Sequence, residues 1–278
     1  MIDAHAARPK RAAIGAPFAA CLACVRLGWR ETWDQKLALA GAFLTYALIV
    51  SVWASLWRLV PDATLARLAL GYEQVVWYFA LTEVIAFSLG HCYRQIQDEI
   101  QAGGVAAFLV RPVGYVPLTA AQELGHMAAK IVLIGVPGCV LAFALTGSVP
   151  FGPALLLPLA ALLVCGGAIF LVLQIMIGLT TAWVGTARPQ FFIVQKCVFV
   201  LGGLIVPLSA YPDLLQRIAW LTPFPATLYA PASLALDPGA AHVGGMLCLQ
   251  AFWLAVGAAG LAGLSAAFER RLTTKGEA

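Results

Sequence analysis

The sequence predicts an all-α, polytopic membrane protein with six transmembrane helices. Of its 278 residues, 62% are hydrophobic and only 11% are charged, whereas a soluble domain carries roughly 25% charged residues. The apolar residues gather in long runs, and the few charged residues separate these runs. A chain with so little charge cannot cover a water-facing surface, so its apolar runs belong in a hydrocarbon core of about 30 Å.

The N-terminal region predicts an amphipathic helix over residues 17–34, beginning at Pro17 because proline suits the first position of a helix. One side carries Phe18, Leu22, Val25, Trp29 and Trp33, and the other carries Arg26, Arg30 and Asp34. Such a helix lies in the membrane interface, with its apolar side in lipid and its cations near anionic head groups. The alternative is a loose terminal tail.

Six apolar runs follow, joined by turns and short polar loops. The spans are predicted at about residues 37–59, 72–93, 118–145, 154–184, 190–206 and 243–268. Trp53 and Trp57 mark the far interface of the first span, because tryptophan favours the head-group region. Pro137 lies inside the third span and predicts a kink there.

Residues 207–241 differ from the spans because prolines interrupt them repeatedly. Prolines stand at positions 207, 212, 223, 225, 231 and 238. A stretch this broken cannot cross the membrane as one helix, so we expect a re-entrant or interfacial hairpin on the outer side.

Lysine and arginine placement predicts the orientation. The loops on the side of the N-terminus carry Arg94, Arg111, Arg188, Arg270, Arg271 and Lys275, and the N-terminus carries Arg8, Lys10, Arg11, Arg26, Arg30 and Lys36; the opposite loops carry Arg58, Arg67 and Arg217. The positive-inside rule therefore places both termini in the cytoplasm. The net charge of +4 does not indicate nucleic-acid binding, because the cations flank apolar spans instead of forming one patch.

The segment 94–117 is a hydrophilic break in this apolar chain, predicted to lie in the cytosol. Its first part reads as a helix with Ile96 and Ile100 on one face and polar residues on the others. A glycine pair at 103–104 then bends the chain, and the Arg-Pro dipeptide at 111–112 ends a second short turn. The segment is either an ordinary connecting loop or a docking element for a cytosolic partner.

Nothing in the sequence indicates an enzyme or a resident cofactor. It contains no GxxxxGK[ST] motif, so we expect no ATP binding by a P-loop in this chain. It also contains no HExxH motif, no GxSxG motif and no pair of carboxylates placed for catalysis.

Glu83, Lys130 and Lys196 are the ionisable residues inside apolar spans. Lys196 lies near a helix end and can extend its ammonium to the interface. Glu83 and Lys130 each lie about 16–18 Å into neighbouring spans, near the midplane. A charge at that depth is costly, so we expect the two to pair, either as a static brace between helices or as a functional pair that opens or contacts substrate.

The order of these elements resembles the permease subunits of type-2 ATP-binding-cassette (ABC) exporters, and more narrowly an ABC-2-like branch long catalogued as a domain of unknown function. The matching stretches are Tyr78-Phe79-x-Leu81-Thr82, Ile96-Gln-Asp98-Glu-Ile100-x-x-Gly103, Phe108-Leu109-Val110-Arg111-Pro112-Val113, and, in the proline-rich hairpin, Pro207 to Pro212, Leu221 to Phe224 and Pro231. The resemblance covers nearly the whole chain.

The resemblance implies a transport role that is shared with partner proteins. Two permease chains, identical or paralogous, would form the pathway in a bacterial plasma (inner) membrane, and separate ATPase subunits would bind ATP and Mg²⁺. The coupling residues expected at the ATPase contact are Ile96, Asp98, Ile100, Gly103, Gly104, Leu109, Arg111 and Pro112. The rival hypotheses are a secondary transporter driven by an ion gradient and a membrane scaffold without transport.

Overall fold

The computed structural model describes residues 16–67, 70–108 and 113–276, and over these ranges the chain is helical without a strand. The longer helices are α1 (Ala16–Asp34), α2 (Lys36–Arg58), α4 (Tyr72–Ser88), α5 (Cys92–Gln101), α6 (Tyr115–Thr146), α7 (Leu156–Leu179), α9 (Arg188–Leu201) and α13 (Ala240–Gly276). The shorter helices are α3 (Asp62–Arg67), α8 (Thr181–Val184), α10 (Asp213–Trp220), α11 (Phe224–Thr227) and α12 (Tyr229–Ala232), with 3-10 turns η1 (Gly104–Phe108), η2 (Pro153–Leu155), η3 (Leu208–Ala210) and η4 (Ser233–Ala235). The all-α prediction is confirmed.

Five stretches of the described chain are long and apolar enough to cross a membrane. They are Lys36–Arg58, Tyr72–Gln101, Tyr115–Thr146, Pro153–Val184 and Ala241–Thr273, and each overlaps one predicted span. The remaining predicted span, 190–206, corresponds to α9, which has 14 residues. At about 1.5 Å per residue, α9 extends only about 21 Å, so it does not cross a core of about 30 Å on its own.

A contact with α4 fixes the place where α9 ends. The Tyr78 hydroxyl donates a hydrogen bond of 2.6 Å to the carbonyl oxygen of Gly203. Gly203 has a φ of +78°, which glycine adopts readily and other residues rarely adopt. The chain therefore turns at this glycine instead of continuing the helix through residue 206.

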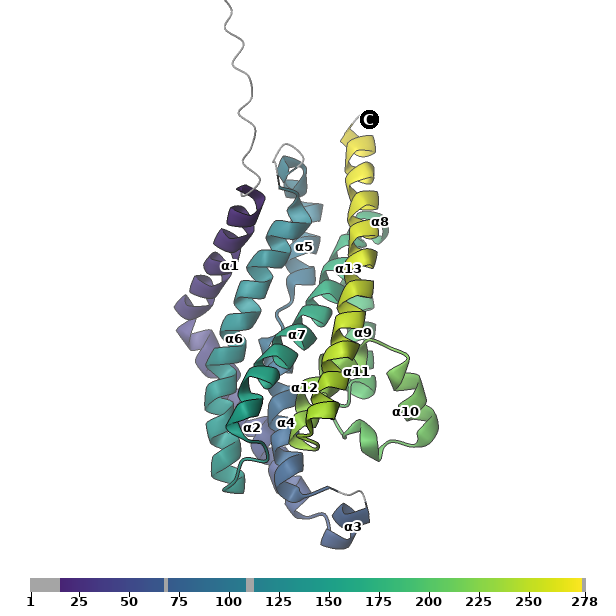
Figure 1. Ribbon diagram of the computed structural model, residues 1–278. Helices are drawn as coiled ribbons and strands as arrows, with labels where there is room; N and C mark the ends of the chain where they lie inside the picture. The colour runs from purple at the N-terminus through teal and green to yellow at the C-terminus, as the bar shows by residue number, and fades with distance from the viewer. Residues whose placement is uncertain (1–15, 68–69, 109–112, 277–278) are drawn as a thin grey trace, which may run out of the picture.

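Helix α4 is the centre of the fold, and every residue from Val75 to Ile85 is buried. It packs against α2, α6, α7, α12 and η4, and these helices surround it in Figure 1. Trp53 of α2 stacks on Phe79 with ring centroids 4.9 Å apart. The continuous apolar sequence of α4 thus reflects burial on all sides inside the protein.

The proline-rich stretch 207–241 folds as a series of short helices. Residues 225–235, which include most of α11 and all of α12 and η4, are buried, and these three helices contact α4, α7 and α13. Gln250 of α13 donates hydrogen bonds of 2.9 Å to the carbonyl oxygens of Leu162 and Ala226. Broken backbone at membrane depth is tolerated where protein covers it; residues 225–235 meet that condition, whereas most of α10 is exposed or half-buried.

Residues 16–34 form a helix, α1, that lies directly against α6 instead of extending away as a loose tail. A side chain at Gly125 of α6 would overlap the carbonyl oxygen of Val25, and one at Gly28 would overlap that of Gln122. The two glycines therefore allow the helix backbones to approach closely.

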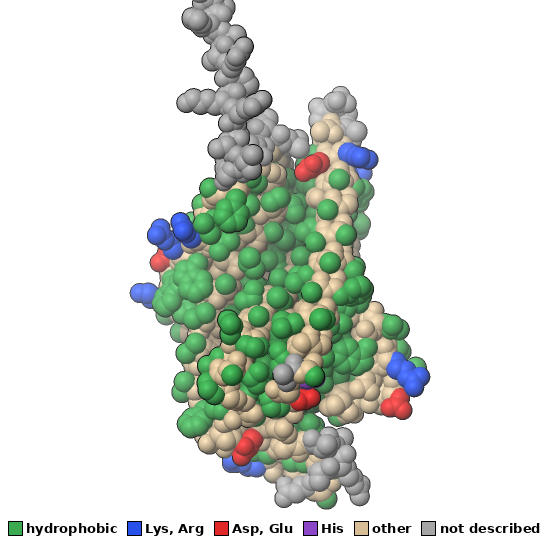
Figure 2. Space-filling view, in the orientation of Figure 1, with side chains coloured by type: hydrophobic (Ala, Val, Ile, Leu, Met, Phe, Trp, Pro, Cys, Tyr) green, Lys and Arg blue, Asp and Glu red, His purple; other side chains and the backbone are tan. Residues whose placement is uncertain are grey.

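The first residues of α1 and the last residues of α13 lie at the same end of the molecule, at the top of Figure 1, together with α5 and α8. Helix α3 lies at the opposite end. On the face seen in Figure 2, hydrophobic side chains form a broad area, with a few charged side chains around it. This distribution fits a protein whose sides face lipid.

Candidate functional site

The hydrophilic segment begins with a break between α4 and α5. Leu89 has extended backbone angles, φ −75° and ψ 118°, and ends α4. Helix α5 then starts at Cys92, after His91. The break lies earlier than the predicted end of the second span at residue 93, so Tyr93 belongs to α5.

Helix α5 has one buried and one exposed face. Its buried residues are Cys92, Tyr93, Ile96 and Gln97, and its exposed residues are Arg94, Gln95, Asp98 and Gln101. Glu99 and Ile100 lie at the boundary and are half-buried. The exposed face is polar and lies at the end of the molecule where α1 begins and α13 ends.

Ile96 is the centre of the buried face, with a relative exposure of 0%. Its side chain lies against Gly178 of α7, where an added Cβ would be 2.9 Å from the Ile96 Cβ. A docked partner therefore cannot reach Ile96 as a surface residue. Ile96 was expected to contact the ATPase; in the structure it instead holds α5 against α7 and positions the exposed residues of α5.

Polar contacts join α5 to the turn between α8 and α9. Gln97 Oε1 accepts a hydrogen bond of 2.7 Å from the backbone N–H of Ala187, just before α9. Gln101 Nε2 donates one of 2.8 Å to the carbonyl oxygen of Gly185. Tyr93 stacks on Phe191 of α9 with ring centroids 3.9 Å apart. A displacement of α5 would therefore move the start of α9.

The bend after α5 is built on glycine, as the sequence predicts. Gly103 has a φ of +75° and is exposed, with no atom within 4 Å of an added Cβ. Gly104 is also exposed and begins η1. Val105 turns inward and is 2% exposed. The other expected coupling residues, Leu109, Arg111 and Pro112, lie outside the described residues.

The expected pair between Glu83 and Lys130 is not formed in this structure. None of the ion pairs within the described ranges joins these two side chains. Lys130 lies toward Glu123 of its own helix: a Cβ at Gly90 would be 3.9 Å from Lys130 Nζ and 3.3 Å from Glu123 Oε2. Glu83 lies within α4, whereas Gly90 lies beyond its end, so the two charges lie at different levels.

A polar cluster between α1 and α6 was not predicted. Glu31 Oε2 lies 2.8 Å from His126 Nε2 and accepts a hydrogen bond of 2.9 Å from Gln122. The other ring nitrogen of His126 lies 3.4 Å from Glu123 Oε1. The hydrogen bonds from His126 and Gln122 hold the pKa of Glu31 below its ordinary value. The sequence feature that could have indicated this cluster is the spacing of residues 122, 123 and 126, which puts their side chains on one face of a helix.

Comparison with known proteins agrees with this architecture. A family model described as ABC-2 family transporter protein matches residues 64–265, which is more than half of the chain. The matched range includes α5, Glu83 and the proline-rich stretch. No curated protein matches the chain. The sequence resemblance to the ABC-2 group is thereby confirmed, and the chain belongs to the ABC-2 family of transporter membrane proteins.

Proposed function

We propose that this chain is the permease subunit of an ATP-driven exporter, with a separate ATPase docked on α5, η1 and the residues that follow. The observation that supports it best is the construction of α5. Its exposed face carries Asp98, and its opposite face is bound to α7 and to the start of α9. A partner that pushes on α5 would thus move helices that enter the membrane.

The proposal includes an orientation in a bacterial plasma membrane, with both termini in the cytoplasm. Arginine and lysine are abundant in the segments at the end of the molecule that holds α5, and they are scarce at the end that holds α3. The positive-inside rule assigns the cation-rich end to the cytoplasm. On that side the cations of α1 can contact anionic head groups, as an interfacial helix does.

The proposal also retains six crossings. Five crossings would leave the start of α2 and the end of α13 on opposite sides of the membrane, whereas the positive-inside pattern assigns both to the cytoplasm. The proposal therefore uses an even number of crossings. In our proposal α9 descends from the cytosolic side and the stretch 207–241 completes the crossing as a re-entrant hairpin, whose short helices α11, α12 and η4 pack against α4, α7 and α13.

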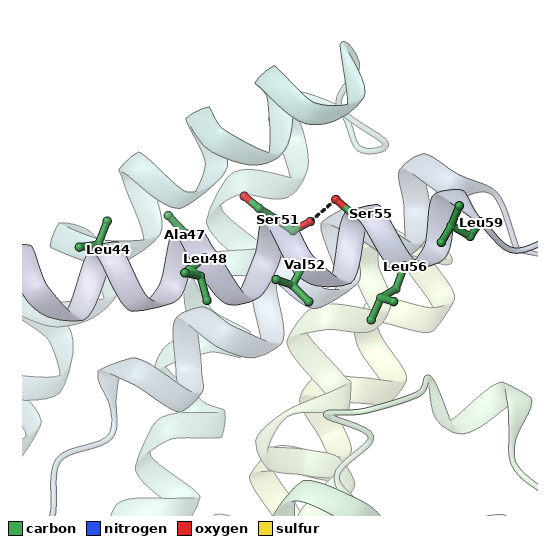
Figure 3. Close-up of a pocket in the computed structure, with 8 residues that line it drawn as sticks. All are labelled: Leu44, Ala47, Leu48, Ser51, Val52, Ser55, Leu56 and Leu59. Atoms are coloured by element: carbon green, nitrogen blue, oxygen red, sulfur yellow. Dashed lines mark hydrogen bonds between the residues drawn. The ribbon is translucent and has the colours of Figure 1, made fainter.

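A second permease chain, identical or paralogous, completes the proposed pathway. Helix α2 presents an apolar face with a shallow hollow of about 530 Å³, and the side chains that line it come from this one helix and from Leu59, which directly follows it (Figure 3). Leu44, Leu48 and Leu56 on this face are at least half exposed. Ser51 and Ser55 are small, which lets another helix approach closely, and the Ser55 hydroxyl is bonded to the Ser51 carbonyl oxygen at 2.8 Å.

An ion-driven secondary transporter is the second candidate function. Glu83 favours it, because buried carboxyl groups in membrane helices often bind the coupling ion. The two functions differ in their energy source. Purification of the chain from native membranes, followed by mass spectrometry, separates them: an exporter permease brings a P-loop ATPase with it, whereas a secondary transporter or a scaffold does not.

Asp98→Lys provides a sharper test of the proposed docking face. Asp98 is exposed on α5, and reversing its charge changes the electrostatic match with any partner that binds there. We expect the amount of co-purifying ATPase to fall about tenfold, which corresponds to about 1.4 kcal/mol of binding free energy. Asp213→Lys is the matched control, because Asp213 is an exposed carboxylate on α10. Equal ATPase recovery from both variants would remove α5 as the docking face.

A further inference from the structure

A cavity of about 390 Å³ lies between α2, α4 and α9. Its walls are mainly apolar and include Ile49, Ala86, Leu89 and Leu204. Small-molecule sites have volumes of about 300–1,000 Å³ and combine apolar walls with a few polar groups. This cavity has the size and the lining of such a site.

Glu83 is the acidic residue that lines this cavity, and it is 5% exposed. No hydrogen bond or ion pair from the described residues reaches its carboxyl group. Neighbouring hydroxyl groups are bonded elsewhere: Tyr46 donates to the Ala80 carbonyl oxygen, and Thr82 to that of Phe79. A buried carboxyl group without a partner is costly in apolar surroundings, so it requires a proton or a cation.

The rest of the lining decides what kind of cation fits. An inorganic cation such as Mg²⁺ or Ca²⁺ needs several oxygen ligands, and the lining supplies one carboxyl group. Phe87 and Phe199 add aromatic rings, whose faces attract organic cations. Neither lysine nor arginine lines the cavity; the Lys196 ammonium lies 5.5 Å from the Phe199 ring centroid. An anion would meet the Glu83 carboxyl group, and no lysine or arginine in the lining would pair with it.

We propose that this cavity binds lipophilic organic cations, with Glu83 as their counter-ion, and that such cations are substrates of the exporter. The assignment of substrate rests on the proposed export function, whereas the binding site itself does not. A neighbouring hollow shares His91 with the cavity and is lined by Arg94 and Arg188. These cations oppose approach from the cytosol by that route, so the ligand reaches Glu83 from the lipid phase.

Binding of tetraphenylphosphonium to the purified full-length chain in detergent tests the site without ATP or a partner. We expect saturable binding of the radiolabelled cation in equilibrium dialysis. Glu83→Gln should weaken it at least tenfold, and Glu83→Asp should retain part of it. Glu73→Gln is the control, because Glu73 is exposed in the first turn of the same helix. Tetraphenylborate, an anion of nearly the same shape, should not compete.

The proposal is overturned if the wild-type chain shows no saturable binding, or if the Gln variant, eluting as the wild type does in size exclusion, binds equally well. Competition by tetraphenylborate would also contradict it, because the site would then select shape and not charge. If tetraphenylphosphonium does not bind but an ATPase co-purifies with the chain, the export proposal stands and lipophilic organic cations are excluded as its substrates. If tetraphenylphosphonium binds but no ATPase co-purifies, the cation site stands and the ATP-driven mechanism is excluded.

Discussion

Replacing Gly103 and Gly104 with valine is expected to release the proposed ATPase partner from the chain while the membrane fold stays intact. Gly103 has a φ of +75°, where an ordinary L residue is disfavoured by roughly 1–2 kcal/mol and a β-branched residue by more. The turn after α5 must then change its path. The strain disfavours the turn conformation that the ATPase is proposed to bind, and about 1.4 kcal/mol corresponds to a tenfold change in a binding constant. We therefore expect the amount of co-purifying ATPase to fall at least tenfold.

The fold should survive this double substitution because the site is open. No atom lies within 4 Å of a Cβ placed at Gly103, and the nearest atom to one at Gly104 is the Glu99 carbonyl oxygen at 3.7 Å. Gly147→Val is a strict control: Gly147 has a φ of +74° and equally open surroundings, but it ends α6. Size exclusion and thermal stability report folding. Undiminished ATPase recovery and ATP hydrolysis in the double variant would show that the bend has no part in docking.

Ile96→Ala is expected to reduce both stability and ATPase recovery, for a different reason. Ile96 is fully buried against α7, and removing a buried isoleucine side chain to alanine typically costs about 2–5 kcal/mol. The cavity left beside Gly178 would loosen α5 from α7. A lower unfolding temperature of the purified chain should therefore accompany weaker binding of the partner.

Ile100→Ala distinguishes a positioning role from a contact role. Ile100 is half-buried at the edge of the exposed face of α5, so its truncation should leave the unfolding temperature nearly unchanged and lower ATPase recovery directly. If Ile96→Ala leaves stability unchanged and the two variants behave alike, Ile96 is a surface contact and the packing account of α5 is wrong.

The membrane helices were predictable because their signal is compositional. Five long apolar runs became five helical stretches long enough to cross a membrane, one of them broken between α4 and α5, since apolar residues must be buried or face lipid whatever their neighbours are. The end of α9 was not predicted. Its sequence remains apolar to Val206, but the hydrogen bond from Tyr78 to Gly203 turns the chain earlier. That contact joins residues 125 positions apart and leaves no local pattern, so the glycine pair at 202–203 is the local sign of this end.

The pairing of Glu83 with Lys130 illustrates a second limit. Residue counting gives the depth of a side chain in the membrane, but it does not give its rotation about the helix axis or the exact start of each helix. In the folded chain Lys130 lies toward Gly90 and Glu123, and Glu83 lines a cavity beside α2 and α9. The partners are set by how α4 and α6 pack, and α4 is apolar on nearly all sides.

The local structure of the segment 94–117 was predictable in character but not in detail, and its coupling role stays a prediction. The sequence pattern identified a short amphipathic helix and a glycine bend, and both are present in α5 and Gly103. It did not show which isoleucine would be covered. Ile96 and Ile100 share a helical face by spacing, yet Ile96, which lies against α7, is fully buried and Ile100 is only half-buried.

Site-specific photo-crosslinking in native membranes tests the central claim, that the exposed face of α5 contacts an ATPase. Asp98 would be replaced by the photoreactive residue p-benzoylphenylalanine in one variant and Asp213 in another, both positions being exposed. We predict a light-dependent adduct between the chain and a P-loop ATPase, identified by mass spectrometry, from position 98 and not from position 213. An ATPase adduct from position 213 alone, or no ATPase adduct from position 98, would contradict the account.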